Sequence, residues 1–296
     1  MKNKKKYAAI DIGSNGIRLL IASVSEKNRL IHVHKLSLVR VPIRLGEDVF
    51  ETGEIGKEKQ KRFLKAIKAY KLLMEVYGVS QYRACATSAM REAKNGTEIC
   101  KNIKKETGIS IELINGKEES DLLFSTLFTQ KIDKKGNYLF IDVGGGSTEV
   151  TIFEEGKRIK SKSFKIGTVR LLQNKVKEKV WEEMDNWLEF INQGNKKYIG
   201  IGTGGNINRY FKMSNNEYLE PLKSNILNNY YQELKQLNPE ERAEKYRLRK
   251  DRADVIVPAG KIYLSILQKC EIEEIIVPKI GLSDGMVYTL YLNNRK

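Results

Sequence analysis

The 296-residue chain alternates between two hydrophobic periods, and each change of period marks a predicted element. An apolar stripe at helical spacing over Lys57–Tyr77 predicts a helix that ends at Gly78. Further helices are predicted over residues 97–107, 118–130, 178–191, 207–213, 253–268 and 283–292, and strands over 29–41, 82–86, 108–114, 197–201 and 272–277. Pro258 is expected to kink its helix or to lie in the first turn. Strands and helices that alternate within two halves favour α/β layers over a solenoid or an all-β sandwich.

One segment of the chain recurs. Residues 7–22 reappear in altered form as residues 138–153, with a constant offset of 131 positions. Each copy reads as an apolar strand, Asp, one residue, Gly, a short turn of small residues and a second apolar strand. The tip of such a hairpin presents backbone N–H groups to a small anion. Arg18 in the first copy stands where Glu149 stands in the second, so one loop offers a cation and the other a carboxylate.

The second copy carries the strongest signal for a ligand. It has three consecutive glycines, Gly144, Gly145 and Gly146, followed by Ser147. Consecutive glycines in a tight turn are costly in chain entropy, and a phosphate bound close to bare amides accounts for that cost. We therefore expect this loop to bind phosphate.

Two further glycine turns have the same chemistry. In the first copy, a close approach to an oxygen ligand is expected at Gly13, Ser14 and Asn15, next to Asp11, which could order a hydrated cation. A third turn precedes the helix predicted over 207–213 and is read as an anion site at a helix N-terminus. Its residues are Gly202, Thr203, Gly204, Gly205 and Asn206.

The composition limits the class of protein. The length favours two domains, and no apolar run approaches the ~20 residues of a membrane-spanning helix. Asp11 interrupts the apolar stretch that follows the basic N-terminus, so a cytoplasmic protein without membrane association is expected. The three cysteines lack CxxC spacing and the two histidines alternate on one predicted strand. Histidine-based catalysis and a conventional zinc site are therefore not expected.

The chain is strongly basic, with 53 Lys and Arg against 37 Asp and Glu and a formal charge of +16. Such an excess attracts polyanions. It is equally typical of solvated lysine-rich helix faces, so the charge agrees with a phosphorylated partner without deciding the question. No aromatic residues interleave with a basic groove as single-stranded RNA recognition needs, and no specific nucleic acid is expected as partner.

Together these residues resemble the Ppx/GppA family of exopolyphosphatases and guanosine pentaphosphate phosphohydrolases. The resemblance covers almost the entire chain. It rests on residues 9–19, 43–46, 86–93, 116–119, 141–149, 252–258 and 283–285. The combination of Asp-Val-Gly-Gly-Gly-Ser-Thr-Glu with Ala-Thr-Ser-Ala-x-Arg-Glu-Ala in one chain is highly specific.

The resemblance implies an α/β fold class, with two ribonuclease-H-like domains of the actin-like ATPase superfamily that face each other across a cleft. The expected boundaries are 1–124 plus 283–296 for the first domain and 125–282 for the second. The last helix would cross back to the first domain, and the chain is similar to the short two-domain members of the family. A homodimer is also what the resemblance implies.

The resemblance also implies roles for single residues. Glu119 matches the catalytic glutamate and Glu149 the other essential acid, whereas Asp11, Asp142 and Glu149 would surround a magnesium ion. The expected reaction is hydrolysis of a terminal phosphoanhydride in polyphosphate or pppGpp, with water attacking in line and Glu119 taking its proton. Further contacts to the phosphates are expected from Arg18, Arg44 and Arg91, and a base or chain contact from Arg252.

Three departures from the family pattern bear on substrate preference or rate. Gly16 stands where the first loop usually has Ser or Thr, and Asn206 replaces a usual Thr but could still cap the helix. Ser120 and Asp121 follow the glutamate pair in place of small, often basic residues.

Two other classes of function stay open at this point. A sugar or acid kinase of the same superfamily would share the two hairpins and the third loop, and would move phosphate to an acceptor. A non-catalytic sensor of alarmones or polyanions would use the charge without the carboxylates.

Overall fold

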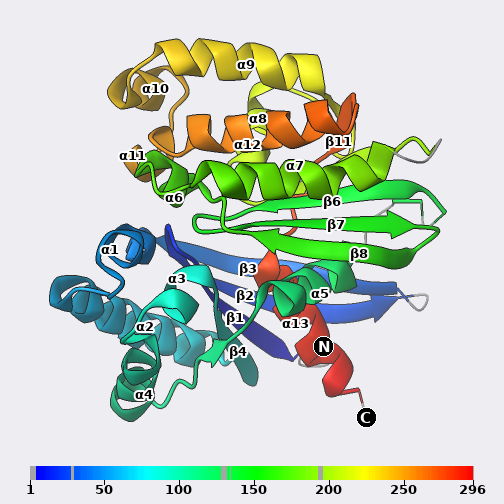
Figure 1. The fold of residues 1–296 in the computed structure, drawn as a ribbon. Coiled ribbons are helices and arrows are strands. Elements are labelled where there is room, and N and C mark those ends of the chain that lie inside the picture. The colour runs from blue at the N-terminus through cyan, green and yellow to red at the C-terminus, as the bar shows by residue number, and fades with distance from the viewer. Residues whose placement is uncertain (1–4, 28–29, 128–131, 134, 193–195, 296) are drawn as a thin grey trace. The chain divides into compact units, whose positions relative to one another are not determined.

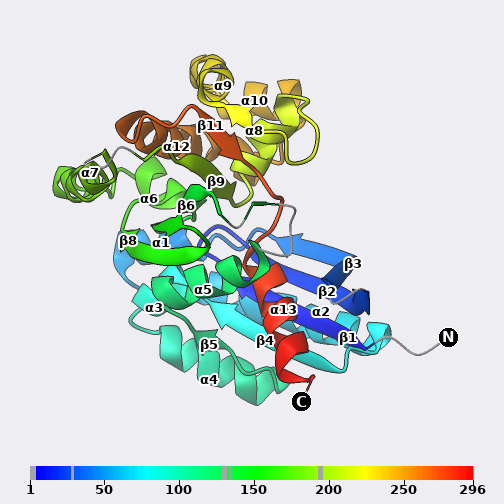
Figure 2. The same ribbon diagram turned by 90° about the vertical axis from the view of Figure 1, so that its right-hand side faces the viewer.

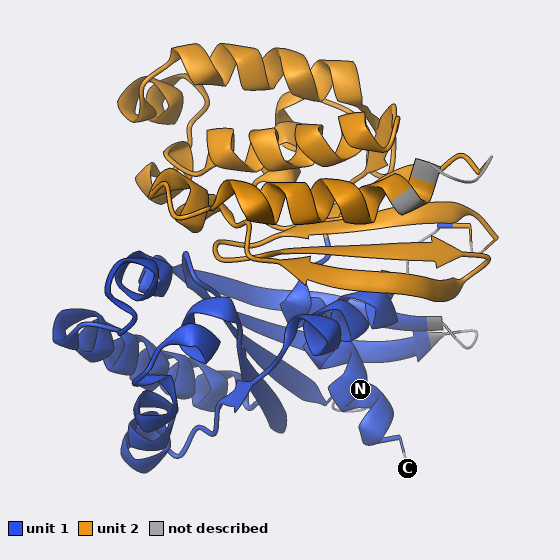
Figure 3. Ribbon diagram, in the orientation of Figure 1, with its two compact units in different colours: residues 1–132, 280–296 blue, residues 133–279 orange. Residues whose placement is uncertain are grey.

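The structure is a computed structural model that describes residues 5–27, 30–127, 132–133, 135–192 and 196–295. It divides into two compact units, of which the first contains residues 1–132 and 280–296 and the second residues 133–279 (Figure 3). The expected domains, 1–124 with 283–296 and 125–282, place their limits a few residues away from these, and the domain boundaries stay a prediction. Among the described residues, none of the helices has the length and apolar character that crossing a membrane requires.

Unit 1 is built on a five-stranded sheet in the order β3-β2-β1-β4-β5 (Figure 1). β1 pairs antiparallel with β2 and parallel with β4. The strands are β1 (Lys6–Ile12), β2 (Ile17–Lys27), β3 (Leu30–Val41), β4 (Gln81–Ala86) and β5 (Glu112–Leu113). The helices are α1 (Leu45–Thr52), α2 (Lys57–Tyr77), α3 (Ser88–Glu92), α4 (Gly96–Thr107), α5 (Gly116–Leu127) and α13 (Leu282–Asn293).

Helices cover the sheet of unit 1. α5 and α13 lie side by side (Figures 1 and 2), and their buried residues Leu122 and Met286 join one core cluster with Tyr7 and Leu20 of the sheet. α2 is anchored to the sheet separately, because the Tyr70 hydroxyl donates to the carbonyl oxygen of Ile17 at 3.1 Å. The final helix, α13, therefore belongs to unit 1, although it comes from the C-terminal end of the chain.

Unit 2 repeats the same plan on a six-stranded sheet in the order β10-β11-β9-β6-β7-β8. The strands are β6 (Asn137–Val143), β7 (Thr148–Glu154), β8 (Lys157–Phe164), β9 (Ile199–Thr203), β10 (Leu222–Lys223) and β11 (Glu274–Ile276). The helices are α6 (Thr168–Leu172), α7 (Glu178–Asn192), α8 (Ile207–Met213), α9 (Ser224–Gln236), α10 (Pro239–Lys245), α11 (Lys250–Ala253) and α12 (Ile256–Lys269). Leu139 and Ile152 of the sheet share a core with Leu188 of α7 and Ile266 of α12.

The repeat seen in the sequence has a structural counterpart. β1–β2–β3 and β6–β7–β8 are antiparallel meanders, and the register pairs Asp11 with Arg18 in one and Asp142 with Glu149 in the other. In each meander the third strand leads into a short helix, α1 or α6, which the sequence did not predict.

Most predicted elements are present, with differences at their ends. α2 and α8 have the predicted bounds, and α2 ends at Gly78 with a left-handed φ of 64°. The helix expected over 253–268 begins at Ile256, which places Pro258 in its first turn, where no intrahelical N–H is needed. The strand expected over 108–114 is reduced to β5, and residues 128–130 of the helix expected over 118–130 lie outside the described residues.

Candidate active site

The turn between β6 and β7 is a hairpin tip made of glycine. Val143 pairs with Thr148, and the N–H of Gly144 donates to the carbonyl oxygen of Ser147 at 2.9 Å. The N–H groups of Gly145, Gly146 and Ser147 donate to no acceptor among the described residues. Three neighbouring donors without a protein partner are typical of an anion-binding turn.

The carbonyl groups of the same turn are bound from behind by the segment that follows β8. The N–H of Thr168 donates to Gly144 at 3.0 Å and the N–H of Val169 donates to Gly145 at 2.9 Å. Contact is so close that a Cβ at Gly167 would lie 2.4 Å from the carbonyl oxygen of Gly145. Residues 167–170 thus fix the shape of the turn.

The tip of the first hairpin is supported in the same way by Arg44, which precedes α1, and by Gly46 in the first turn of that helix. The N–H of Gly46 donates to Ser14 at 2.8 Å, and the N–H of Arg44, at a left-handed φ of 60°, donates to Asn15 at 3.2 Å. A side chain at Gly16 would lie 3.0 Å from the Arg40 guanidinium, which gives a steric reason for glycine there.

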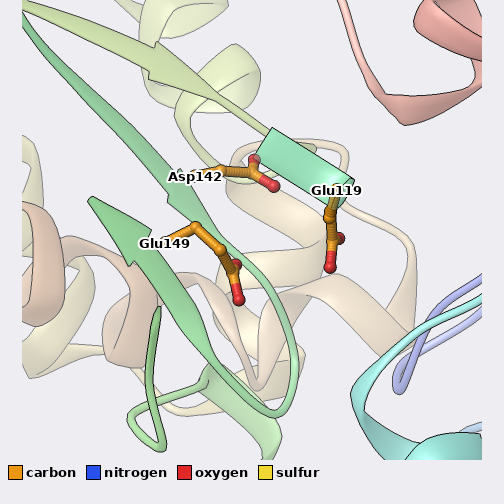
Figure 4. A group of neighbouring side chains, drawn as sticks. All are labelled: Glu119, Asp142 and Glu149. Carbon is orange, nitrogen blue, oxygen red and sulfur yellow. The ribbon is translucent and has the colours of Figure 1, made fainter. Parts of the chain in front are cut away.

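Two carboxylates of unit 2 flank its glycine turn. Figure 4 shows Asp142 and Glu149 on adjacent strands, and both are almost fully buried, with 9% and 1% of their surface exposed. The hydroxyls of Ser147 and Ser163 each donate to Oε1 of Glu149 at 2.7 Å, and Thr203 donates to Oδ1 of Asp142 at 2.5 Å. Hydroxyl donors favour the ionised form of a buried carboxyl group, and carboxylate oxygens are the ligands that magnesium prefers.

Asp11 of unit 1 has a different partner from Asp142. Its Oδ2 accepts from the Arg18 guanidinium at 2.6 Å, and the carboxylate is 4% exposed. Arg18, which stands where unit 2 has Glu149, therefore pairs with the aspartate of unit 1. The role of Asp11 as a metal ligand stays a prediction.

Glu119, drawn in Figure 4, lies in the first turn of α5 and is 9% exposed. The neighbouring Glu118 points to a different environment, because its Oε1 accepts from the Arg83 guanidinium at 3.0 Å. Arg91 donates to the carbonyl oxygen of Ile114 at 2.6 Å, close to the start of the same helix. Glu119 thus lies on α5, and Arg91 of α3 binds the segment that precedes α5.

The third glycine turn follows β9 and carries a buried network. The Tyr263 hydroxyl donates to the carbonyl oxygen of Thr203 at 2.5 Å, and burial raises the pKa of that tyrosine well above its ordinary value. Arg252 donates to the carbonyl oxygen of Gly205 at 2.8 Å, so it supports the turn. Asn206 precedes α8, but its side chain makes no capping bond, which corrects the expectation that it could cap this helix.

Sequence reasoning missed Ser163, Gly167 and Arg170. They lie in β8 and in the segment after it, neither of which the sequence predicted.

Comparisons with known proteins bear on the fold and the family of this chain. Among solved structures, an Aquifex aeolicus member of the Ppx/GppA protein family is 26% identical and superposes with a TM-score of 0.78 over 99% of each chain. An exopolyphosphatase from Cytophaga hutchinsonii is 25% identical and superposes with a TM-score of 0.85 over 98% of each chain. These likenesses confirm the expected fold class of two actin-like α/β domains.

Two curated proteins extend the comparison. Exopolyphosphatase 1 of Mycobacterium tuberculosis is 30% identical over 146 residues, which are 49% of this chain and 42% of that protein. The bifunctional 3-dehydroquinate synthase/phosphatase of Fusobacterium nucleatum is 33% identical over 219 residues, 68% of this chain and 33% of that protein. The chain therefore spans less than half the length of these two relatives. The family model described as the Ppx/GppA phosphatase family matches residues 20–294, and the chain belongs to that family.

Proposed function

We propose that this chain releases terminal phosphate from inorganic polyphosphate by hydrolysis of a phosphoanhydride bond. The observation that carries the proposal is the turn at 144–147, whose three N–H donors have no protein acceptor among the described residues and lie beside two buried carboxylates. The similarity to proteins named exopolyphosphatase supports the reaction class. Phosphoryl transfer demands mainly positioning and charge neutralisation, which such a turn supplies.

The donor set suits a magnesium ion. Asp142 and Glu149 offer carboxylate oxygens on adjacent strands, and the hydroxyls of Ser147, Ser163 and Thr203 orient them. Asp142 and Glu149 would hold the ion, which would supply positive charge to offset that of the phosphoryl group. The serine and threonine hydroxyls would hold the carboxylates in one orientation, so that the ligands are in place for the ion.

Glu119 is proposed as the general base. Its position in the first turn of α5 and its low exposure leave a carboxylate in a sheltered place, as proton abstraction from water needs. The proposal requires that unit 1 brings Glu119 within reach of a phosphoryl group held by the turn at 144–147. Arg18, Arg44 and Arg91 stay candidates for additional phosphate contacts.

The substrate class is the finer part of the proposal. The formal charge of +16 favours a repeating anion, and we therefore place polyphosphate before pppGpp. A cytoplasmic location and a homodimer stay predictions from the sequence.

A phosphate-release assay with purified protein and magnesium tests the proposal directly. Polyphosphate, pppGpp and ATP are compared as substrates, and release from polyphosphate is expected to be fastest. Transfer of labelled γ-phosphate from ATP to a small acceptor, with no free phosphate, would support the kinase alternative instead. No release from any of the three would overturn the proposal.

The role of Glu119 has a matched control in its neighbour. Glu119→Gln is expected to lose about 10²- to 10⁴-fold in kcat while it retains substrate binding, because general-base catalysis contributes that much. Glu118→Gln removes an acid of the same kind that is bound to Arg83, and near-normal turnover is expected. Equal turnover in the two variants would remove Glu119 from the mechanism.

A further inference from the structure

Arg170 is a buried arginine that lies directly behind the glycine turn of unit 2. It is 9% exposed, and its Nε donates to the carbonyl oxygen of Gly146 at 2.9 Å. Its own N–H also donates to the carbonyl oxygen of Gly145, at 3.2 Å. A charged side chain is costly to bury, so its presence here calls for a reason beyond packing.

Peptide geometry explains what this contact does to the turn. In a trans peptide, the C=O of one residue and the N–H of the next point in opposite directions. The carbonyl of Gly146 and the N–H of Ser147 form one such peptide, since the chain has no cis bonds among its described residues. Because Arg170 holds the carbonyl, the N–H of Ser147 is directed away from the arginine and toward the open side of the turn.

The same relation holds along the whole turn. Thr168 holds the carbonyl of Gly144 and thereby directs the N–H of Gly145, and Val169 holds the carbonyl of Gly145 and directs the N–H of Gly146. The first two of these three carbonyls accept from backbone amides. The third, that of Gly146, accepts from the charged side chain of Arg170.

A charged donor also changes how strongly the peptide group that it binds can donate its own hydrogen bond. Hydrogen bonds polarise one another, and a charge-assisted bond to the carbonyl makes the opposite N–H a stronger donor. The guanidinium adds a positive potential behind the turn, in a place where little water screens it.

We propose that Arg170 is a positioning residue for the terminal phosphate: it orients and polarises the Gly146–Ser147 peptide so that the turn binds an anionic phosphoryl group. The inference rests on the proposed function of the turn and adds a residue outside the glycine motif. Because Gly167 has no side chain, the segment that carries Arg170 can lie close enough to the turn for this contact.

Binding of imidodiphosphate, a pyrophosphate analogue with a nitrogen bridge, separates this role from turnover. Arg170→Met is expected to weaken binding about 10- to 100-fold by titration calorimetry, which is the order of effect expected from a hydrogen bond to a charged group. Arg170→Gln retains a neutral donor of lower strength and is expected to fall between wild type and Arg170→Met. Lys245→Met removes one charge from an exposed ion pair of α10 and is expected to bind within about twofold of wild type.

A spectroscopic readout covers the case in which Arg170→Met does not fold. In the folded Arg170→Gln protein, the amide proton of Ser147 is expected to shift less on addition of imidodiphosphate than in wild type, while Gly145 keeps most of its shift. Binding by Arg170→Met or Arg170→Gln equal to wild type would overturn the inference and leave the proposed function standing. A wild-type protein that binds neither imidodiphosphate nor orthophosphate would overturn both.

Discussion

At the scale of single residues, the candidate site depends on which group neutralises or orients each carboxylate. Glu149 is 1% exposed and accepts from two hydroxyls on one oxygen, whereas Asp11 accepts from an arginine. These two environments explain why two similar hairpins have different chemistry. The hydroxyl of Ser163 comes from β8, outside the glycine motif, and completes the environment of Glu149.

Removal of that hydroxyl is expected to impair both stability and turnover. Ser163→Ala removes the hydroxyl that donates to Oε1 of Glu149, at a cost of about 1–3 kcal/mol in the free energy of unfolding. Denaturant unfolding and phosphate release measure the two effects, and Ser163→Thr is expected to restore most of both. Ser161→Ala, on the same strand and bonded to Thr151, serves as the control and should leave turnover unchanged.

At the scale of elements, α5 is held in place by α13, which comes from the other end of the chain. The contact is close because a glycine faces it: a Cβ at Gly285 would lie 2.1 Å from the carbonyl oxygen of Leu122. Gly285 ends the Ser-Asp-Gly segment through which the chain resembles its family. Glycine is thus required at 285 so that α13 can pack closely against α5, the helix that carries Glu119.

Whether Gly285→Ala raises or lowers the stability of the protein tests this packing. Gly285→Ala would stabilise an isolated helix by about 1 kcal/mol, but here it is expected to destabilise the protein by about 1–3 kcal/mol because it overfills the contact. Gly281→Ala is the control, since its Cβ would meet nothing closer than Asp284 at 3.9 Å. Thermal or denaturant unfolding of the two variants decides the matter, and a stabilised Gly285→Ala protein would contradict the proposed contact.

At the scale of the whole molecule, three unpaired thiols distributed over both units link stability to pH. Burial raises the pKa of Cys85 and of Cys270 from 9.0 to about 12, and that of Cys100 to about 11. The folded protein therefore holds these protons more tightly than the unfolded chain does. The contribution to stability is fully present below pH 9 and is lost as the pH rises toward 12.

We accordingly expect the free energy of unfolding to fall above pH 9. Each thiol contributes at most about 1.4 kcal/mol per pH unit between its unfolded and folded pKa. Denaturant unfolding at a series of pH values measures the slope, and Cys270→Ala separates the thiol from the lysines that titrate in the same range. An identical slope in Cys270→Ala and wild type would show that this thiol does not couple to folding.

The sequence by itself determined the features that depend on local chemistry. The helix Lys57–Tyr77 with its glycine cap, the two repeated hairpins and the glycine turn at 144–147 follow from periodicity and from the backbone freedom of glycine. The alternation of predicted strands and helices was also enough to predict the α/β fold class. These signals lie within short segments, so no knowledge of distant residues is needed to read them.

Only the tertiary structure decided what lies behind and beside those turns. Arg170, Ser163 and Gly285 act on residues 24, 14 and 163 positions away in the chain, so periodicity carries no trace of them. The pairing of Arg18 with Asp11 likewise depends on strand register. Long-range contacts arise when separate elements pack together, and the identity of the partner is then set by the fold as a whole.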